Sequence, residues 1–291
     1  MVLESDGGRD DCARIVQHWA GRTVPISENS RPLFRRPIAF GVVIGTYAAL
    51  PYVHLQLEAW RRFYPHVRLL VHDDASVRQN ELQELCEHYG CDFEVNARRM
   101  PQYLGDISAF YGGLLWAEDC GVDLLVKISR RWLFLLDWTR SLEQLALDSQ
   151  YATFSNYTKT FSFGFRTECT GMSVRHWTES HVFQSMASRI AAEQPVFVEH
   201  YIHQFARAFE TVNSQTADAW RSQHPVPHEH SGYAAWDLMG SDRGSAEPEG
   251  THLWHDFHRP SDYARVAREW DLPYSERDFA DPNEGGGIGG H

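Results

Sequence analysis

The stretch from 122 to 129, VDLLVKIS, constrains the fold of this chain more than any other. Its apolar residues are almost unbroken, and such a run suits a strand that is covered on both faces of a parallel sheet. The segment before it has apolar residues at three- and four-residue spacing, which predicts an amphipathic helix with Asp106 as its N-cap. The strand ends in Lys127, Arg130 and Arg131. Ligands bind at this edge of open α/β sheets, so the three cations indicate an anionic ligand.

Strands and helices alternate along the first half of the chain. The predicted strands lie at 38–46, 67–72 and 91–95, and the predicted helices at 51–64 and 76–89. Ser76 and Gln79 have the spacing of a capping box for the second helix. Residues 151–174 are strand-prone but mixed in character. We therefore predict an α/β fold with a Rossmann-type, mostly parallel sheet flanked by helices and a small mixed-sheet excursion.

The chain is expected to form one domain with irregular ends. Residues 1–36 are polar and broken by prolines, which predicts an N-terminal extension. The domain covers 37–272, with a nucleotide-binding half at 37–138 and an acceptor half at 139–272. The glycine-rich residues 273–291 are predicted to be a disordered tail.

The composition excludes several functional classes. A formal net charge of -12 without a long basic block argues against nucleic-acid binding, which depends on lysine and arginine. The five cysteines form no C-x-x-C pair, so neither a disulfide framework nor a zinc knuckle is indicated, and we expect a cytoplasmic protein. We find no signal peptide and no run of about 18 apolar residues, and we expect no membrane span.

Four pieces of sequence occur in a characteristic order between 38 and 210. They are IGTYAALPYV, VHDDAS, the helix GDISAFYGGLLWA with its following strand, and TGMSVRHW before VEHYIHQFAR. In this order they resemble the nucleotide-diphospho-sugar glycosyltransferases of the GT-A fold. The resemblance implies that Thr46, Asp73 and Asp74 hold the base and ribose of a nucleotide, and that Asp106 closes the same pocket. The alternative is that the two adjacent carboxylates only cap the turn before the next helix.

The end of the central strand departs from this family. Most members carry an Asp-any-Asp pair there that holds Mn²⁺ or Mg²⁺ against the diphosphate, whereas this chain has Lys127, Arg130 and Arg131. Cations repel a metal ion and attract a diphosphate, so we expect no cofactor and predict metal-independent stabilisation of the leaving group by these residues and Arg243. Adjacent residues of an extended chain point to opposite faces, so at most one of the two arginines enters the site. The alternative is that both are solvated or paired with nearby carboxylates.

A carboxylate near the acceptor hydroxyl is required if the transfer inverts the sugar configuration. Glu199 lies where the family often places its acidic acceptor-side residue. Glu168 and Asp237 are the next candidates for this role. The alternative for Glu199 is that it stabilises a helix N-terminus through the macrodipole.

Histidines are concentrated late in the chain. The family often completes its metal or diphosphate site with a late histidine, and the LWH sequence that ends in His255 is similar to that feature. His252, His255 and His258 could alternatively bind a metal if their rings converged. A helix beginning only near Ser261 argues against that convergence.

The sequence therefore favours a glycosyltransferase that moves a sugar from a nucleotide-diphosphate sugar to a hydroxyl of a glycan, a lipid-linked intermediate or a small metabolite. Inversion is mildly preferred. One alternative is a GT-A-like module that binds nucleotide or glycan without turnover. A second is a nucleotidyltransferase, although the loop after the first strand lacks the glycines and cations that such enzymes place there.

Overall fold

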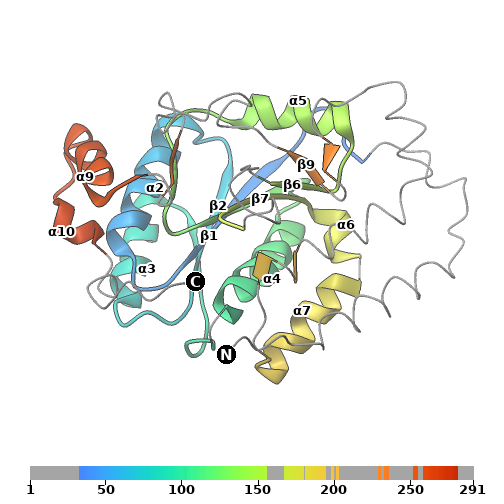
Figure 1. Ribbon diagram of the computed structural model, residues 1–291, viewed down its shortest axis with the longest axis horizontal. Coiled ribbons are helices and arrows are strands. Elements are labelled where there is room, and N and C mark those ends of the chain that lie inside the picture. Colours follow the sequence, from blue (N-terminus) through green and yellow to red (C-terminus); the bar gives the residue numbers. More distant parts are fainter. Residues whose placement is uncertain are drawn as a thin grey trace, which may run out of the picture.

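The computed structural model describes residues 33–101, 103–155, 167–179, 181–194, 198–199, 201–202, 229–230, 233–235, 252–254 and 258–280 (Figure 1). The predicted N-terminal extension lies outside these residues except for its last four. No helix in this part of the chain combines the length and the apolar character that crossing a membrane requires.

An eight-stranded sheet with the order β3-β2-β1-β4-β7-β6-β9-β8 forms the centre of the protein. The parallel part consists of β1 (Phe40–Thr46), β2 (Arg68–Asp73), β3 (Asp92–Val95) and β4 (Leu124–Ser129). The mixed part consists of β6 (Thr153–Ser155), β7 (Cys169–Ser173), β8 (Glu229–His230) and β9 (Tyr233–Ala235). Because β7 is antiparallel to β4, the mixed part begins directly beside the central strand. The predicted fold class is confirmed.

Helices cover both faces of this sheet (Figure 1). One face packs against α2 (Leu50–Phe63), α3 (Gln79–Tyr89) and α5 (Thr139–Ser149). The other face packs against α4 (Leu104–Asp119), α6 (Val174–Thr178) and α7 (His181–Ala192). Successive side chains of β4 alternate between the two layers, since Val126 belongs to the first core and Leu125 to the second. This double burial explains the apolar run of the sequence.

The C-terminal part of the chain returns to the first half of the domain. Strand β10 (His252–Trp254) pairs with β5 (Trp132–Phe134), which follows β4 directly. Helices α9 (Pro260–Glu269) and α10 (Glu276–Phe279) then pack outside α2 (Figure 1). Phe279 is 1% exposed, and its carbonyl accepts a hydrogen bond of 2.6 Å from the hydroxyl of Tyr52. The tail predicted to be disordered from residue 273 is therefore ordered as far as 280, because it covers apolar surface of α2.

Two predicted helix starts are wrong. Helix α4 begins at Leu104 with Tyr103 as its N-cap, so Asp106 is the third residue of the helix and lies within its first turn. Helix α3 begins after Arg78, and the Ser76 side chain bonds to the Asp73 carboxylate instead of capping the helix. In both places the side chain with the spacing of a cap bonds to another residue. Asp106 bonds to Lys127, and Ser76 bonds to Asp73.

Candidate functional site

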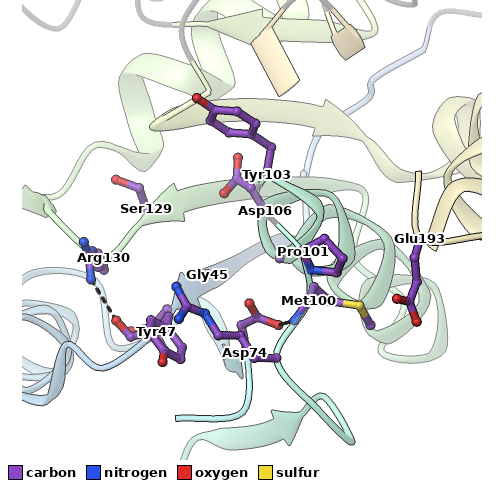
Figure 2. Close-up of a pocket in the computed structure, with 13 residues that line it drawn as sticks. Gly45, Tyr47, Asp74, Met100, Pro101, Tyr103, Asp106, Ser129, Arg130 and Glu193 are labelled. Atoms are coloured by element: carbon purple, nitrogen blue, oxygen red, sulfur yellow. Dashed lines mark hydrogen bonds between the residues drawn. The ribbon is translucent and has the colours of Figure 1, made fainter. Parts of the chain in front are cut away.

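A cleft of about 870 Å³ opens at the carboxyl ends of β1, β2 and β4 (Figure 2). Strand β1 leads into α2 on one face of the sheet, while α4 leads into β4 on the other. In the strand order β3-β2-β1-β4 the chain direction across the sheet reverses between β1 and β4, and a crevice at such a switch point is the usual ligand site of an open α/β sheet. The lining residues are Gly45, Thr46, Tyr47, Asp74, Arg99, Met100, Pro101, Tyr103, Gly105, Asp106, Ser129, Arg130 and Glu193. Four predicted site residues, Thr46, Asp74, Asp106 and Arg130, are thus brought together.

Asp74 is held in place from one side of the cleft. Its Oδ1 accepts hydrogen bonds from the Asn96 side chain at 2.8 Å and the Met100 backbone N–H at 2.9 Å. Its Oδ2 lies so close to Gly105 that a Cβ at that glycine would be 2.5 Å away. The first turn of α4 can approach the carboxylate only because residue 105 has no side chain.

Asp73 faces the protein interior. Its carboxylate accepts hydrogen bonds from the Ser76 backbone N–H at 2.7 Å and the Ser76 hydroxyl at 2.5 Å. Burial raises the pKa of Asp73, although these hydrogen bonds favour its charged form. The Ser76 hydroxyl also accepts a 2.7 Å hydrogen bond from the Ala48 N–H. Asp73 therefore connects the loops after β1 and β2 and does not line the cleft, which agrees with the alternative that it holds a turn.

Two hydroxyls lie at the adjoining ends of β1 and β4. Thr46 Oγ1 and Ser129 Oγ are buried, and neither has a hydrogen-bond partner among the described residues. Both residues line the cleft, and Thr46 is only 6% exposed. Buried hydroxyls without a partner are uncommon, so these two positions are suited to hydrogen bonding with a ligand.

Lys127 lies behind the wall of the cleft. Its side chain is 1% exposed and forms an ion pair with Asp106, whose side chain is 28% exposed. The Lys127 ammonium also donates to the Thr167 carbonyl at 3.2 Å and lies 4.8 Å from the centre of the Phe110 ring. The cation that the sequence assigned to a diphosphate is therefore directed at a carboxylate of the cleft.

Arg130 is the arginine of the pair that reaches the cleft. Its Nη1 donates a 2.8 Å hydrogen bond to the Tyr47 carbonyl (Figure 2). Arg131 does not line the cleft, and its backbone carbonyl accepts a 2.6 Å hydrogen bond from Tyr263. This arrangement agrees with the prediction that at most one of the two enters the site.

Sequence reasoning missed a second arginine of the cleft. The Arg99 guanidinium lies 3.9 Å from the centre of the Tyr47 ring, and both side chains line the cleft. The neighbouring Arg98 forms an ion pair with Glu193 at the end of α7. The two adjacent arginines before α4 are visible in the sequence as a local cluster of charge. A search for apolar periodicity does not detect such a cluster.

The remaining predicted residues do not gather at the cleft. Glu199 is partly buried, and neither it nor Glu168 lines the cleft, so the role of each stays a prediction. Arg243, His255 and Asp237 lie outside the described residues.

His252, one of the late histidines, packs in the core of the protein. His252 is fully buried and stacks on Trp132 with ring centroids 4.5 Å apart. Burial lowers the pKa of His252 to about 3, with a smaller contribution from His258. A ring that stays neutral at ordinary pH and packs on an indole is suited to a core position.

The residues of the cleft do not fit a divalent cation. Where the family resemblance implies paired carboxylates, β4 ends at Ser129 and is followed by Arg130, and Asp106 is neutralised by Lys127. Within the described ranges no group of three histidines, cysteines or carboxylates could hold a metal ion. A hard cation binds oxygen ligands, and the carboxylates that line the cleft already have partners: Lys127 for Asp106, Asn96 and the Met100 N–H for Asp74, and Arg98 for Glu193. The donor set is therefore better suited to an anion.

Several solved structures of known proteins are similar to this chain. No protein-family model and no curated protein matches the chain. The galactosyltransferase LgtC, in complex with donor and acceptor sugar analogues, has 11% identity and a TM-score of 0.44 over 84% of this chain and 99% of LgtC. The mannosyltransferase PcManGT from Pyrobaculum calidifontis, in complex with GDP-Man and Mn²⁺, has 11% identity and a TM-score of 0.40 over 77% of this chain and 84% of that protein.

A cytidylyltransferase from Leptospira borgpetersenii serovar Hardjo-bovis is also similar. It has 12% identity and a TM-score of 0.39 over 85% of this chain and 94% of that protein.

Proposed function

We propose that this chain is a glycosyltransferase that moves a sugar from a nucleotide-diphosphate sugar to a hydroxyl acceptor without a divalent metal ion. The sequence resemblance to the GT-A glycosyltransferases supports the activity. The cleft supports it independently, since it lies at the switch point of the sheet and is lined by carboxylates, hydroxyls and arginines. A nucleotide-diphosphate sugar offers the matching groups, which are hydroxyls, a base and two phosphates.

The observation that carries the proposal is the position of Arg130. It lines the cleft directly after β4, where the resemblance places a metal ion against the diphosphate. A guanidinium can bind two phosphate oxygens through parallel hydrogen bonds and keeps its charge at any working pH. When the bond from the sugar to the diphosphate breaks, negative charge grows on the leaving phosphate. Arg130 meets this charge, and Arg99 adds a second cation to the same cleft.

Lys127 acts through Asp106 rather than on the phosphate. Its buried ammonium orients the Asp106 carboxylate and neutralises it. An unpaired carboxylate at this place would repel the diphosphate, so the ion pair keeps the wall of the cleft compatible with an anionic ligand. Lys127 is therefore a positioning residue of the site.

Glu199 remains our proposal for the base that accepts the proton of the acceptor hydroxyl. The proposal rests on its place in the sequence resemblance. A Glu199→Gln variant is expected to bind the donor normally and to lose turnover. Loss of donor binding together with turnover would contradict this role.

A binding module without turnover is the second candidate, because the neutralised Asp106 and the missing acidic pair remove groups that metal-dependent members use. The two candidates differ in turnover but not in nucleotide binding. Release of nucleoside diphosphate in the presence of an acceptor panel would separate them.

The first experiment is calorimetry with a panel of nucleoside diphosphates and nucleotide sugars, each in EDTA and again with Mn²⁺. We expect one nucleotide to bind equally well under both conditions. The Arg130→Ala variant should weaken that binding, while Arg131→Ala serves as the matched control because Arg131 does not line the cleft. Binding only with Mn²⁺ would contradict the metal-free mechanism, and absence of all nucleotide binding would contradict the proposed function.

A further inference from the structure

Tyr103 combines exposure, backbone strain and a place in the cleft. It is 43% exposed, and the other exposed large apolar residues in the described part of the chain are aliphatic: Val77, Val95 and Leu115. Its φ of 66° and ψ of -19° lie in the left-handed region, which bulky residues rarely occupy. Strained residues persist where the surrounding structure enforces them, and they are concentrated at ligand sites.

The strain follows from the turn that opens α4. The Leu104 N–H donates a 3.0 Å hydrogen bond to the Pro101 carbonyl, which closes a four-residue turn with Tyr103 in third position. The dihedral angles of Tyr103 are those that favour glycine at the third position of a type II turn. Leu104 is fully buried in the core beneath α4. This burial anchors the turn, and the Tyr103 side chain is carried into the cleft.

The Tyr103 ring and the Asp106 carboxylate lie on the same side of the cleft (Figure 2). They occupy the N-cap and third positions of α4, which are neighbours on the helix surface. Lys127 holds Oδ1 of Asp106, and no described residue bonds to Oδ2. The carboxylate is therefore fixed in orientation and retains an acceptor beside the ring.

A partly exposed ring next to a fixed acceptor matches the chemistry of a pyranose. The C–H groups on one face of such a sugar pack on an aromatic ring, and its equatorial hydroxyls donate to a carboxylate at the edge. We propose that Tyr103 and Asp106 form the subsite for the sugar of the donor, an inference that rests on the proposed function. Arg130 lies at the end of β4, and the subsite lies at the start of α4, so the diphosphate and the sugar have separate contacts.

The test compares a nucleotide sugar with its nucleoside diphosphate on the full chain by calorimetry. Tyr103→Gly removes the ring and suits the left-handed backbone. It should weaken binding of the nucleotide sugar about tenfold and leave the nucleoside diphosphate unchanged. Tyr103→Phe keeps the ring and should bind both within about twofold of the wild type. Asp271→Gly is the matched control, since it replaces another left-handed residue, at a φ of 57°, that does not line the cleft.

Several outcomes would overturn the subsite. The first is that Tyr103→Gly weakens binding of the nucleotide sugar and of the nucleoside diphosphate equally. The second is that Tyr103→Phe weakens binding of the nucleotide sugar as much as Tyr103→Gly does. The third is that neither variant weakens binding. The melting temperature of Tyr103→Gly should be no lower than that of the wild type, because strain is released. A clearly lower value would show that the ring is structural. Failure of the wild type to bind any nucleotide would contradict the proposed function itself.

Discussion

The ion pair between Lys127 and Asp106 gives an asymmetric prediction for stability. The Lys127 side chain is 1% exposed, whereas the Asp106 side chain is 28% exposed. Asp106→Asn leaves a buried ammonium without a counter-charge, which costs about 3–5 kcal/mol of unfolding free energy. Lys127→Met fills the space beside Phe110 with an apolar chain and leaves a carboxylate that water can reach. It removes hydrogen bonds at a cost of about 1–2 kcal/mol.

The double variant separates this explanation from simple loss of packing. With both charges removed, no unpaired ion remains, and the Met side chain suits its apolar surroundings. We therefore expect the double variant to be more stable than Asp106→Asn alone. The interaction free energy from the double-mutant cycle should be about 2–3 kcal/mol.

Urea unfolding of the four proteins, followed by tryptophan fluorescence, measures these differences. The slopes of the transitions should agree, so that midpoints report stability and not a change in the denatured state. Equal costs for the two single variants would refute the asymmetry. Additive costs in the double variant would refute the pairing of the two charges.

Three further predictions concern the cleft and the core. Arg130→Ala should weaken nucleoside diphosphate binding about 10–100-fold by calorimetry, and Arg131→Ala should not change it. Gly105→Ala should weaken the same binding, because its Cβ would lie 2.5 Å from Asp74 Oδ2 and displace that carboxylate; an unchanged affinity would show that Asp74 does not contact the nucleotide. The pKa of His252 is about 3 in the folded protein and 6.5 in a model peptide, so the folded state resists protonation as the pH falls. Between pH 6.5 and about pH 5 this should cost about 1.5 kcal/mol of unfolding free energy, a loss that His252→Phe should remove in urea titrations at both pH values.

The elements of the fold could be predicted because the sheet is buried on both faces. The apolar run at 122–129 marks β4, and the alternating strands and helices predict a mostly parallel sheet around it. The start of α4 could not be predicted in the same way. A tyrosine in the left-handed region is set by the turn and by the burial of Leu104, and propensity favours glycine there.

The cleft was predicted in part for a similar reason. Strand ends identify Thr46, Asp74 and Arg130, because carboxyl ends of parallel strands meet at one edge. The partner of Lys127 depends on packing between the sheet and α4, because its side chain points toward that helix and meets Asp106 there. Sequence spacing places a cation near the site, but tertiary packing decides which charges face the cleft.

The return of the C-terminal segment to α2 affects how the chain folds during synthesis. The residues that complete the outer face of α2 lie beyond 252, and they include Tyr263 and Phe279. Until these residues emerge from the ribosome, apolar side chains of α2 such as Leu55 remain uncovered, although the strands beside them have already been made. Nascent chains with such a surface are prone to aggregation and are substrates for chaperones. Helix α2, which is made early, therefore reaches its final environment only when α9 and α10 have been translated.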